Sequence, residues 1–106
     1  MLTATVNKAP RMVQVMVRML GTLRDASVDS EDLIFQDEVD VSGTVQRLVE
    51  EHGERLAGLL LDNVLLNPFP NALILLNGVE INNLEGLRTA VRDGDLLTII
   101  PIVHGG

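Results

Sequence analysis

Hydrophobic and polar positions alternate along residues 11–20, RMVQVMVRML. Val13, Val15 and Val17 take every second place, with a polar or mixed side chain between them. A period of two is typical of a strand that buries one face, so we expect a strand here that ends at Gly21. The short apolar centre Leu33–Phe35, which has charged flanks, predicts a second strand that can pair with the first as a hairpin.

The spacing of apolar positions changes to three and four in SGTVQRLVEEHG, residues 42–53, and predicts a helix. Ser42 or Thr44 is the expected N-cap, because a short hydroxyl side chain can accept a hydrogen bond from the first turn. Gly53 is the expected end, since helices commonly stop at a left-handed glycine. A short helical turn is expected around Leu56–Leu60.

A continuous apolar run meets Asn77-Gly78 in NALILLNGVEI. Asn-Gly suits the positive φ angles of a type I′ hairpin turn, so Ala72–Leu76 and Val79–Ile81 are predicted to pair. A brief helical turn is expected near Leu84 and Leu87, a turn at RDGD, and a last strand in LLTIIPIV. This order predicts an α+β fold in which one main helix covers a mixed sheet of about five strands.

Composition indicates one domain in a chain of 106 residues. We expect a flexible leader over residues 1–10, the domain over 11–102 and an exposed tail over 103–106. No cysteine is present, which excludes disulfides and thiolate metal sites and fits the cytoplasm. The formal charge of -7 disfavours nucleic acid, and no stretch is apolar enough to predict a signal peptide or a membrane span.

Reactive groups are scattered. His52 is expected to face the dipole at the end of its helix, and with His104 it makes no metal pattern, so no metal site is predicted. Asp93 and Asp95 are expected to form the RDGD turn. No glycine-rich phosphate loop is present. The remaining acidic clusters are interpreted as solvated surface. They are Glu31–Asp32 on a loop, Asp37–Glu38–Asp40 on a strand edge and Glu50–Glu51 on a helix face.

The sequence ends in PIVHGG. Gly105 and Gly106 can lie extended and pass through a channel too narrow for any side chain. The carboxylate of Gly106 is a poor electrophile, but adenylation by a partner would make it an acyl donor to sulfur or to an amine. We therefore predict that Gly106 is the reacting group.

These residues, with the stretches LILLNGVEI and GLRTAVRDGDLLTIIPIVHGG, resemble the ubiquitin-like β-grasp family of sulfur carriers and modifiers. That family includes molybdopterin synthase small subunits, small archaeal modifiers and the ubiquitin-related modifier. The resemblance implies a β-grasp fold whose last strand delivers the tail. It also implies no directly bound cofactor, but a ubiquitin-activating-type enzyme that uses ATP and magnesium to adenylate Gly106.

Two fates of the activated tail stay open: a thiocarboxylate that donates sulfur, or an isopeptide bond to lysines of target proteins. The rival hypothesis is a small subunit of molybdopterin synthase whose tail enters a larger subunit. A third hypothesis is an interaction domain that is never conjugated. We expect partners to contact the final strand and tail, which are Pro101, Ile102, Val103, His104 and Gly105.

Overall fold

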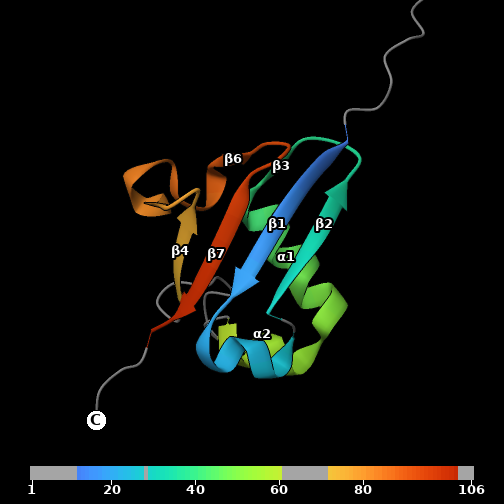
Figure 1. The fold of residues 1–106 in the computed structure, drawn as a ribbon, viewed down its shortest axis with the longest axis vertical. Coiled ribbons are helices and arrows are strands. Elements are labelled where there is room, and N and C mark those ends of the chain that lie inside the picture. The colour runs from blue at the N-terminus through green and yellow to red at the C-terminus, as the bar shows by residue number, and fades with distance from the viewer. Residues whose placement is uncertain (1–11, 28, 61–71, 103–106) are drawn as a thin grey trace, which may run out of the picture.

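The computed structural model describes residues 12–27, 29–60 and 72–102. Its main sheet has five strands in the order β2-β1-β7-β4-β5. Figure 1 shows this sheet face on, with α1 crossing behind β1 and β2. The strands of this sheet are β1 (Val13–Met19), β2 (Ser30–Phe35), β4 (Ala72–Leu76), β5 (Val79–Glu80) and β7 (Leu96–Pro101).

The predicted first hairpin is confirmed. Along β1 buried and exposed residues alternate without a break, so each valine identified from the sequence faces the core. β2 pairs with β1 in antiparallel fashion, with Val13 opposite Phe35 and Arg18 opposite Ser30. A 3-10 helix, Gly21–Ala26, follows β1 directly.

β7 is the central strand. It runs parallel to β1 and antiparallel to β4, which makes the sheet mixed, as predicted. A parallel pair needs a long crossover, and α1 lies within the crossover that links the two halves of the sheet. The last strand therefore lies between the first strand and β4.

The hairpin at Asn77-Gly78 has the predicted geometry. Asn77 has a φ of 50° and Gly78 a φ of 85°, the two positive values that a type I′ turn requires. The strand after the turn is one residue shorter than predicted: β5 ends at Glu80 and not at Ile81. Ile81 is buried and begins a 3-10 helix, whose first turn is held by the Glu80 carboxylate accepting from Asn82 N at 2.6 Å.

The main helix, α1, spans Val41–His52, and the N-cap prediction is wrong. The N-cap is Asp40, whose Oδ1 accepts a hydrogen bond from Gly43 N at 2.7 Å. Thr44 lies inside the helix and donates its hydroxyl to the carbonyl of Asp40 at 2.9 Å. Gly53 ends the helix with a φ of 82°, as expected.

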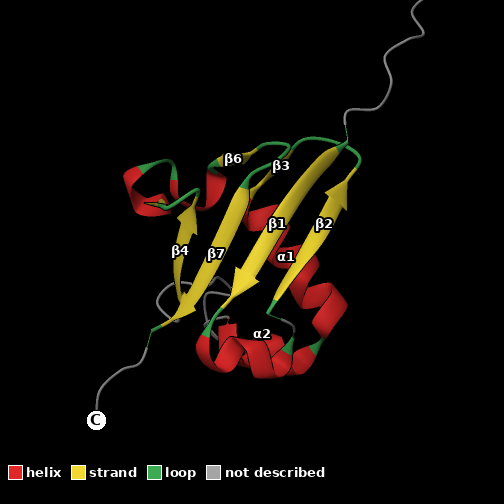
Figure 2. Cartoon of the chain, in the orientation of Figure 1, coloured by secondary structure: helices red, strands yellow, loops and turns green. Residues whose placement is uncertain are grey.

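Short elements complete the fold. The turn expected around Leu56–Leu60 is a helix, α2 (Glu54–Leu60), and further 3-10 helices span Ile81–Asn83 and Gly86–Arg88. A second sheet was not predicted: β3 (Val39–Asp40) pairs with β6 (Ala90–Val91) in antiparallel fashion. Figure 2 shows α1 and α2 on one side of the sheet.

The core lies between the sheet and these helices. The inward residues of β1, β4 and β7 meet the apolar stripe of α1 and the two buried leucines of α2. Burial of this much apolar surface is the main stabilising term of the fold. The buried apolar residues are Val13, Val15, Val17, Met19, Leu23, Leu33, Phe35, Val41, Val45, Leu48, Leu56, Leu60, Ala72, Ile74, Leu76, Ile81, Val91, Leu97 and Ile99.

Candidate functional site

β7 carries the chain from the core to the predicted reactive end. Leu97 and Ile99 are fully buried, so the strand is anchored on its inner face. Pro101 is the last residue of the strand and Ile102 follows it with 41% of its surface exposed. Val103, His104, Gly105 and Gly106 lie outside the described residues. The structure therefore describes the anchored base of the tail, which ends at Ile102, and these four residues follow it in the sequence.

The base of the tail is held by the turn after β1. Leu20 N donates to the carbonyl of Ile99 at 3.1 Å, which extends the contact between the two strands beyond their paired registers. Gly21 has a φ of 59°, and a Cβ placed on it would lie 2.8 Å from Pro101 Cγ. The ring of Pro101 therefore occupies space that only a glycine at position 21 leaves free.

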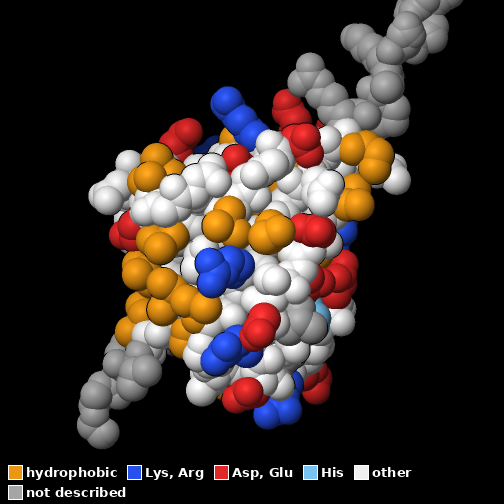
Figure 3. Space-filling model, viewed as in Figure 1, with side chains coloured by type: hydrophobic (Ala, Val, Ile, Leu, Met, Phe, Trp, Pro, Cys, Tyr) orange, Lys and Arg blue, Asp and Glu red, His pale blue; other side chains and the backbone are white. Residues whose placement is uncertain are grey.

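The outer face of the sheet beside this base is apolar. Ile100 lies opposite Leu73 on β4, and both side chains point away from the core, as does Leu75 in the next outward row. Leu73 keeps 36% of its surface exposed. Figure 3 shows the resulting hydrophobic patch over β4 and β7, next to the point where the described chain ends. We call Leu73, Leu75, Ile100 and Ile102 the outer apolar patch.

His52 has a partner that the sequence did not reveal. It is the last residue of α1, as predicted, and its Nε2 pairs with Glu31 Oε1 of β2. Both side chains are mostly buried, so the interpretation of Glu31 as a solvated loop residue is wrong. The pair fastens the end of α1 to the edge strand of the sheet, which is a structural role.

The other acidic clusters divide between surface and structure. Glu50 and Glu51 are exposed on α1 as predicted, and Glu51 lies 3.9 Å from Arg47. Asp40 is the last residue of β3 and also caps α1, so its interpretation as solvated surface is wrong, because its carboxylate satisfies the first turn of the helix.

The RDGD turn ties three elements together. Asp93 Oδ1 accepts from Gln14 N at 2.8 Å, which joins the turn to the start of β1. Asp95 accepts from Arg92 N at 2.7 Å and from Asn77 Nδ2 at 2.9 Å, which joins it to the hairpin. The predicted turn-forming role of both residues is confirmed, and their oxygens are already engaged in backbone and amide contacts.

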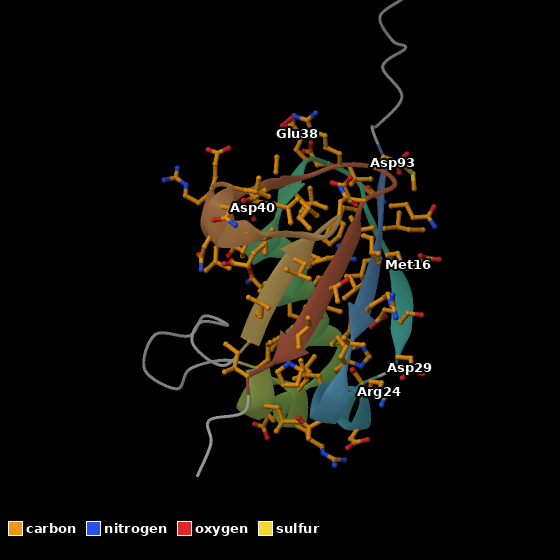
Figure 4. All side chains as sticks on the ribbon, turned by 60° about the vertical axis from the view of Figure 1, so that its left-hand side comes forward. Met16, Arg24, Asp29, Glu38, Asp40 and Asp93 are labelled. Carbon is orange, nitrogen blue, oxygen red and sulfur yellow. The ribbon has the colours of Figure 1, made fainter. Side chains whose placement is uncertain are left out.

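The described residues offer few other candidates for a binding or catalytic site. A hollow of about 600 Å³ opens at the end of the sheet opposite the tail, and Val39, Val91, Glu38 and Asp93 are among the residues that line it. Figure 4 labels Glu38 and Asp93 at this end. Among residues 12–27, 29–60 and 72–102, no three His, Asp or Glu side chains are grouped so as to hold a metal ion. Within the same ranges, no helix has the length and apolar character that crossing a membrane requires.

Comparison with known proteins decides the family. The ThiS family matches residues 17–106. This chain belongs to that family. Its relatives are ubiquitin-like β-grasp sulfur carriers and modifiers, so the resemblance and the β-grasp fold inferred from the sequence are confirmed.

Two curated relatives are similar over most of their length. Small archaeal modifier protein 3 of Haloferax volcanii is 32% identical over 95 residues, which are 89% of this chain and 100% of the relative. A putative sulfur carrier protein of Archaeoglobus fulgidus is 35% identical over 82 residues, which are 76% of this chain and 91% of the relative. The chain is thus a ubiquitin-like protein of the modifier and sulfur-carrier type.

Solved structures agree with the fold. Small archaeal modifier protein 1 of Methanosarcina acetivorans superposes with a TM-score of 0.76 at 26% identity, covering 91% of this chain and 99% of that one. A putative molybdopterin converting factor subunit 1 of Pyrococcus furiosus gives a TM-score of 0.65 at 22% identity, covering 86% and 99%. The second likeness shows the shared fold alone.

Proposed function

We propose that this carrier is activated at the carboxylate of Gly106 by a ubiquitin-activating-type adenylating enzyme that uses ATP and magnesium. The observation that carries the proposal is the position of β7, a buried central strand that ends beside the outer apolar patch. A tail anchored in this way starts from a fixed point, while its glycines leave room to enter a partner's active site. We propose that this takes place in the cytoplasm.

The chemistry asks little of the chain beyond its carboxylate. An oxygen of the Gly106 carboxylate attacks the α-phosphorus of ATP, the bond to the β-phosphate breaks, and pyrophosphate leaves. A sulfur donor or a lysine amine of a target protein then attacks the acyl carbon, and AMP leaves with the bonding electron pair. Every group that stabilises these steps belongs to the partner, so we propose that this chain is a substrate of enzymes rather than an enzyme.

The outer apolar patch is the proposed docking surface for that partner. Three of its residues, Leu73, Leu75 and Ile100, project from one face of β4 and β7, and Ile102 directly follows β7. Apolar side chains exposed together at such a place favour a protein contact. Docking there would hold Gly106 within a few residues' reach of the bound surface.

Pyrophosphate exchange tests the proposal. The full chain is incubated with the adenylating enzyme of its own organism, ATP, magnesium and labelled pyrophosphate, and label returning to ATP reports reversible adenylate formation. We expect exchange with the natural chain and none with a chain that lacks Gly106. Equal exchange by both chains, or none by the natural chain, would refute activation at Gly106.

The two fates of the acyl group need a separate experiment. Modification of other proteins predicts covalent adducts of this chain in a lysate of its own organism, which should disappear with Gly106. Service as a molybdopterin synthase small subunit predicts instead that molybdopterin formation depends on the chain. We favour the modifier and general sulfur-carrier role, because the relatives that are at least 30% identical carry those descriptions.

A further inference from the structure

Arg18 stands on the outer face of the sheet without a charge partner. It is an outward residue of β1, and the registers place it opposite Thr98 on β7 and Ser30 on β2. Within the described chain, no Asp or Glu forms an ion pair with it, whereas Arg24 and Arg47 each have a carboxylate within 4.0 Å. Arg18 is therefore an exposed positive group on this face that no described carboxylate holds in an ion pair.

Beyond the polar residues paired with it, Arg18 adjoins the apolar part of the outer face. The next outward row along β1 places Met16, which is 45% exposed, between Leu96 on β7 and Asp32 on β2, and Asp32 forms no ion pair with Arg18 within the described chain. Leu75, a member of the outer apolar patch, lies opposite Thr98, one strand further from Arg18. Figure 3 shows basic side chains adjoining the orange surface in the middle of this face. A partner that covers the outer apolar patch would cover Arg18 as well.

A hollow lies beside Arg18 at the end of β1 and β2. It has a volume of about 200 Å³ and its wall includes Arg18, Leu20, Ser30 and the pair Arg24–Asp29. Arg24 Nε is 3.4 Å from Asp29 Oδ1, so that pair is internally balanced, and Figure 4 shows the two side chains next to each other. The hollow is large enough for one short acidic side chain.

Covering an unpaired guanidinium with an apolar surface carries a high desolvation cost. A carboxylate removes that cost, because it accepts two parallel hydrogen bonds from the planar guanidinium. We propose that the partner docking on this face presents an Asp or Glu side chain, flanked by apolar side chains, to Arg18. The inference rests on the proposed function, since the occupant is the activating enzyme.

The charge of the whole chain makes this contact selective. With a formal charge of -7, the long-range field of the chain favours partners with a basic surface. An acidic group set opposite Arg18 is attracted only in one orientation of docking, the one that brings it to the outer face. Arg18 therefore affects the orientation in which the partner docks more than the frequency with which the partner and this chain collide.

Pyrophosphate exchange at varied carrier concentration tests the inference. The natural chain is compared with Arg18→Ala, Arg18→Lys and Arg18→Glu, and with Arg92→Glu as a control that makes the same charge change at the far end of the sheet. We expect the half-saturating concentration to rise about tenfold or more for Arg18→Ala, further for Arg18→Glu, and less for Arg18→Lys. Arg92→Glu should stay within about threefold of the natural chain, and thermal unfolding of every variant confirms that it folds.

The outcomes separate the two hypotheses. Exchange by the natural chain that is lost with Arg18→Glu but retained with Arg92→Glu supports the inference. Equal half-saturation for Arg18→Glu and Arg92→Glu would overturn it and leave activation at Gly106 standing. A natural chain that shows no exchange overturns both. The natural chain could instead form a dimer through this face. If Arg18→Glu abolished that dimer but left the exchange unchanged, the face would be assigned to a second copy of the chain and the inference would be overturned.

Discussion

Gly21 offers a sharp test of how the base of the tail is built. Two glycines have nearly the same positive φ angle, 59° at Gly21 and 60° at Gly86. They differ in what an added Cβ would meet, because it would lie 2.8 Å from Pro101 Cγ and 3.4 Å from Pro101 Cδ at Gly21, and nothing within 4 Å at Gly86. Substitution by alanine at both positions therefore separates backbone strain from the contact with Pro101.

The expected magnitudes follow from these two terms. A left-handed conformation costs an alanine about 1–2 kcal/mol, which both substitutions share. The approach to Pro101 adds about 1–3 kcal/mol to Gly21→Ala alone, the usual cost of forcing an extra carbon into a packed place. Gly86→Ala should thus lower the free energy of unfolding by about 1–2 kcal/mol and Gly21→Ala by about 2–5 kcal/mol.

Urea unfolding of the two single variants, of Pro101→Ala and of the double variant Gly21→Ala/Pro101→Ala measures both terms. Because Pro101→Ala removes the Cγ and Cδ atoms that the new Cβ would strike, the double variant should recover about 1–3 kcal/mol relative to the sum of its singles. Equal losses for Gly21→Ala and Gly86→Ala, together with additive singles, would refute the close packing of Pro101 on Gly21.

Three further predictions concern the helix, the docking surface and the attachment site. Asp40→Ala should lower the free energy of unfolding, measured in urea, by about 0.5–2 kcal/mol, because the first turn of α1 loses its cap. The control Glu50→Ala, on the exposed face of α1, should change it by less than about 0.5 kcal/mol. Equal losses for the two variants would contradict the capping role. Ile102→Asp should weaken binding to the activating enzyme, measured by titration, and leave the thermal midpoint unchanged; unaltered affinity would contradict the position of the patch. If the protein modifies other proteins, copies of it can be linked to one another only through Lys8, the single lysine of the sequence, or through the N-terminal amine, and peptide mapping should find only these linkages. A linkage at any residue after position 10 would contradict this prediction.

The elements that the sequence predicted are those with a local signal. The alternating valines of β1 and the glycine at the end of α1 each carry their own conformational preference, and both are confirmed. The Asn77-Gly78 turn is a further case, since its dihedral angles follow from two residues alone. For these three features local chemistry was sufficient, because each depends on residues close together in the sequence.

Features that depend on distant residues were missed. β3 and β6 have two residues each and pair across some 50 positions of the chain, so neither can show a periodicity. The helix cap was misplaced because Ser42 and Thr44 have the right chemistry, but pairing of Val39 and Asp40 with β6 places Asp40 at the start of the helix. The contact of His52 with Glu31 also depends on the tertiary fold alone.

The candidate site was predicted in part. The sequence indicated Pro101 and Ile102, because they precede the two glycines. It did not indicate Leu73 and Arg18, because a continuous apolar run such as NALILL does not reveal that one face of its strand is left uncovered. That face exists because α1 and α2 both lie on the other side of the sheet.

Intact mass tests the central claim most directly. The full chain is incubated with its adenylating enzyme, ATP, magnesium and a sulfur donor, and is then weighed and fragmented. Activation at Gly106 predicts a gain of about 16 mass units, from replacement of one oxygen by sulfur, confined to the fragment that contains Gly106. An unchanged mass, with no adduct through Gly106 after incubation with target proteins, would contradict the account and leave the chain as an interaction domain.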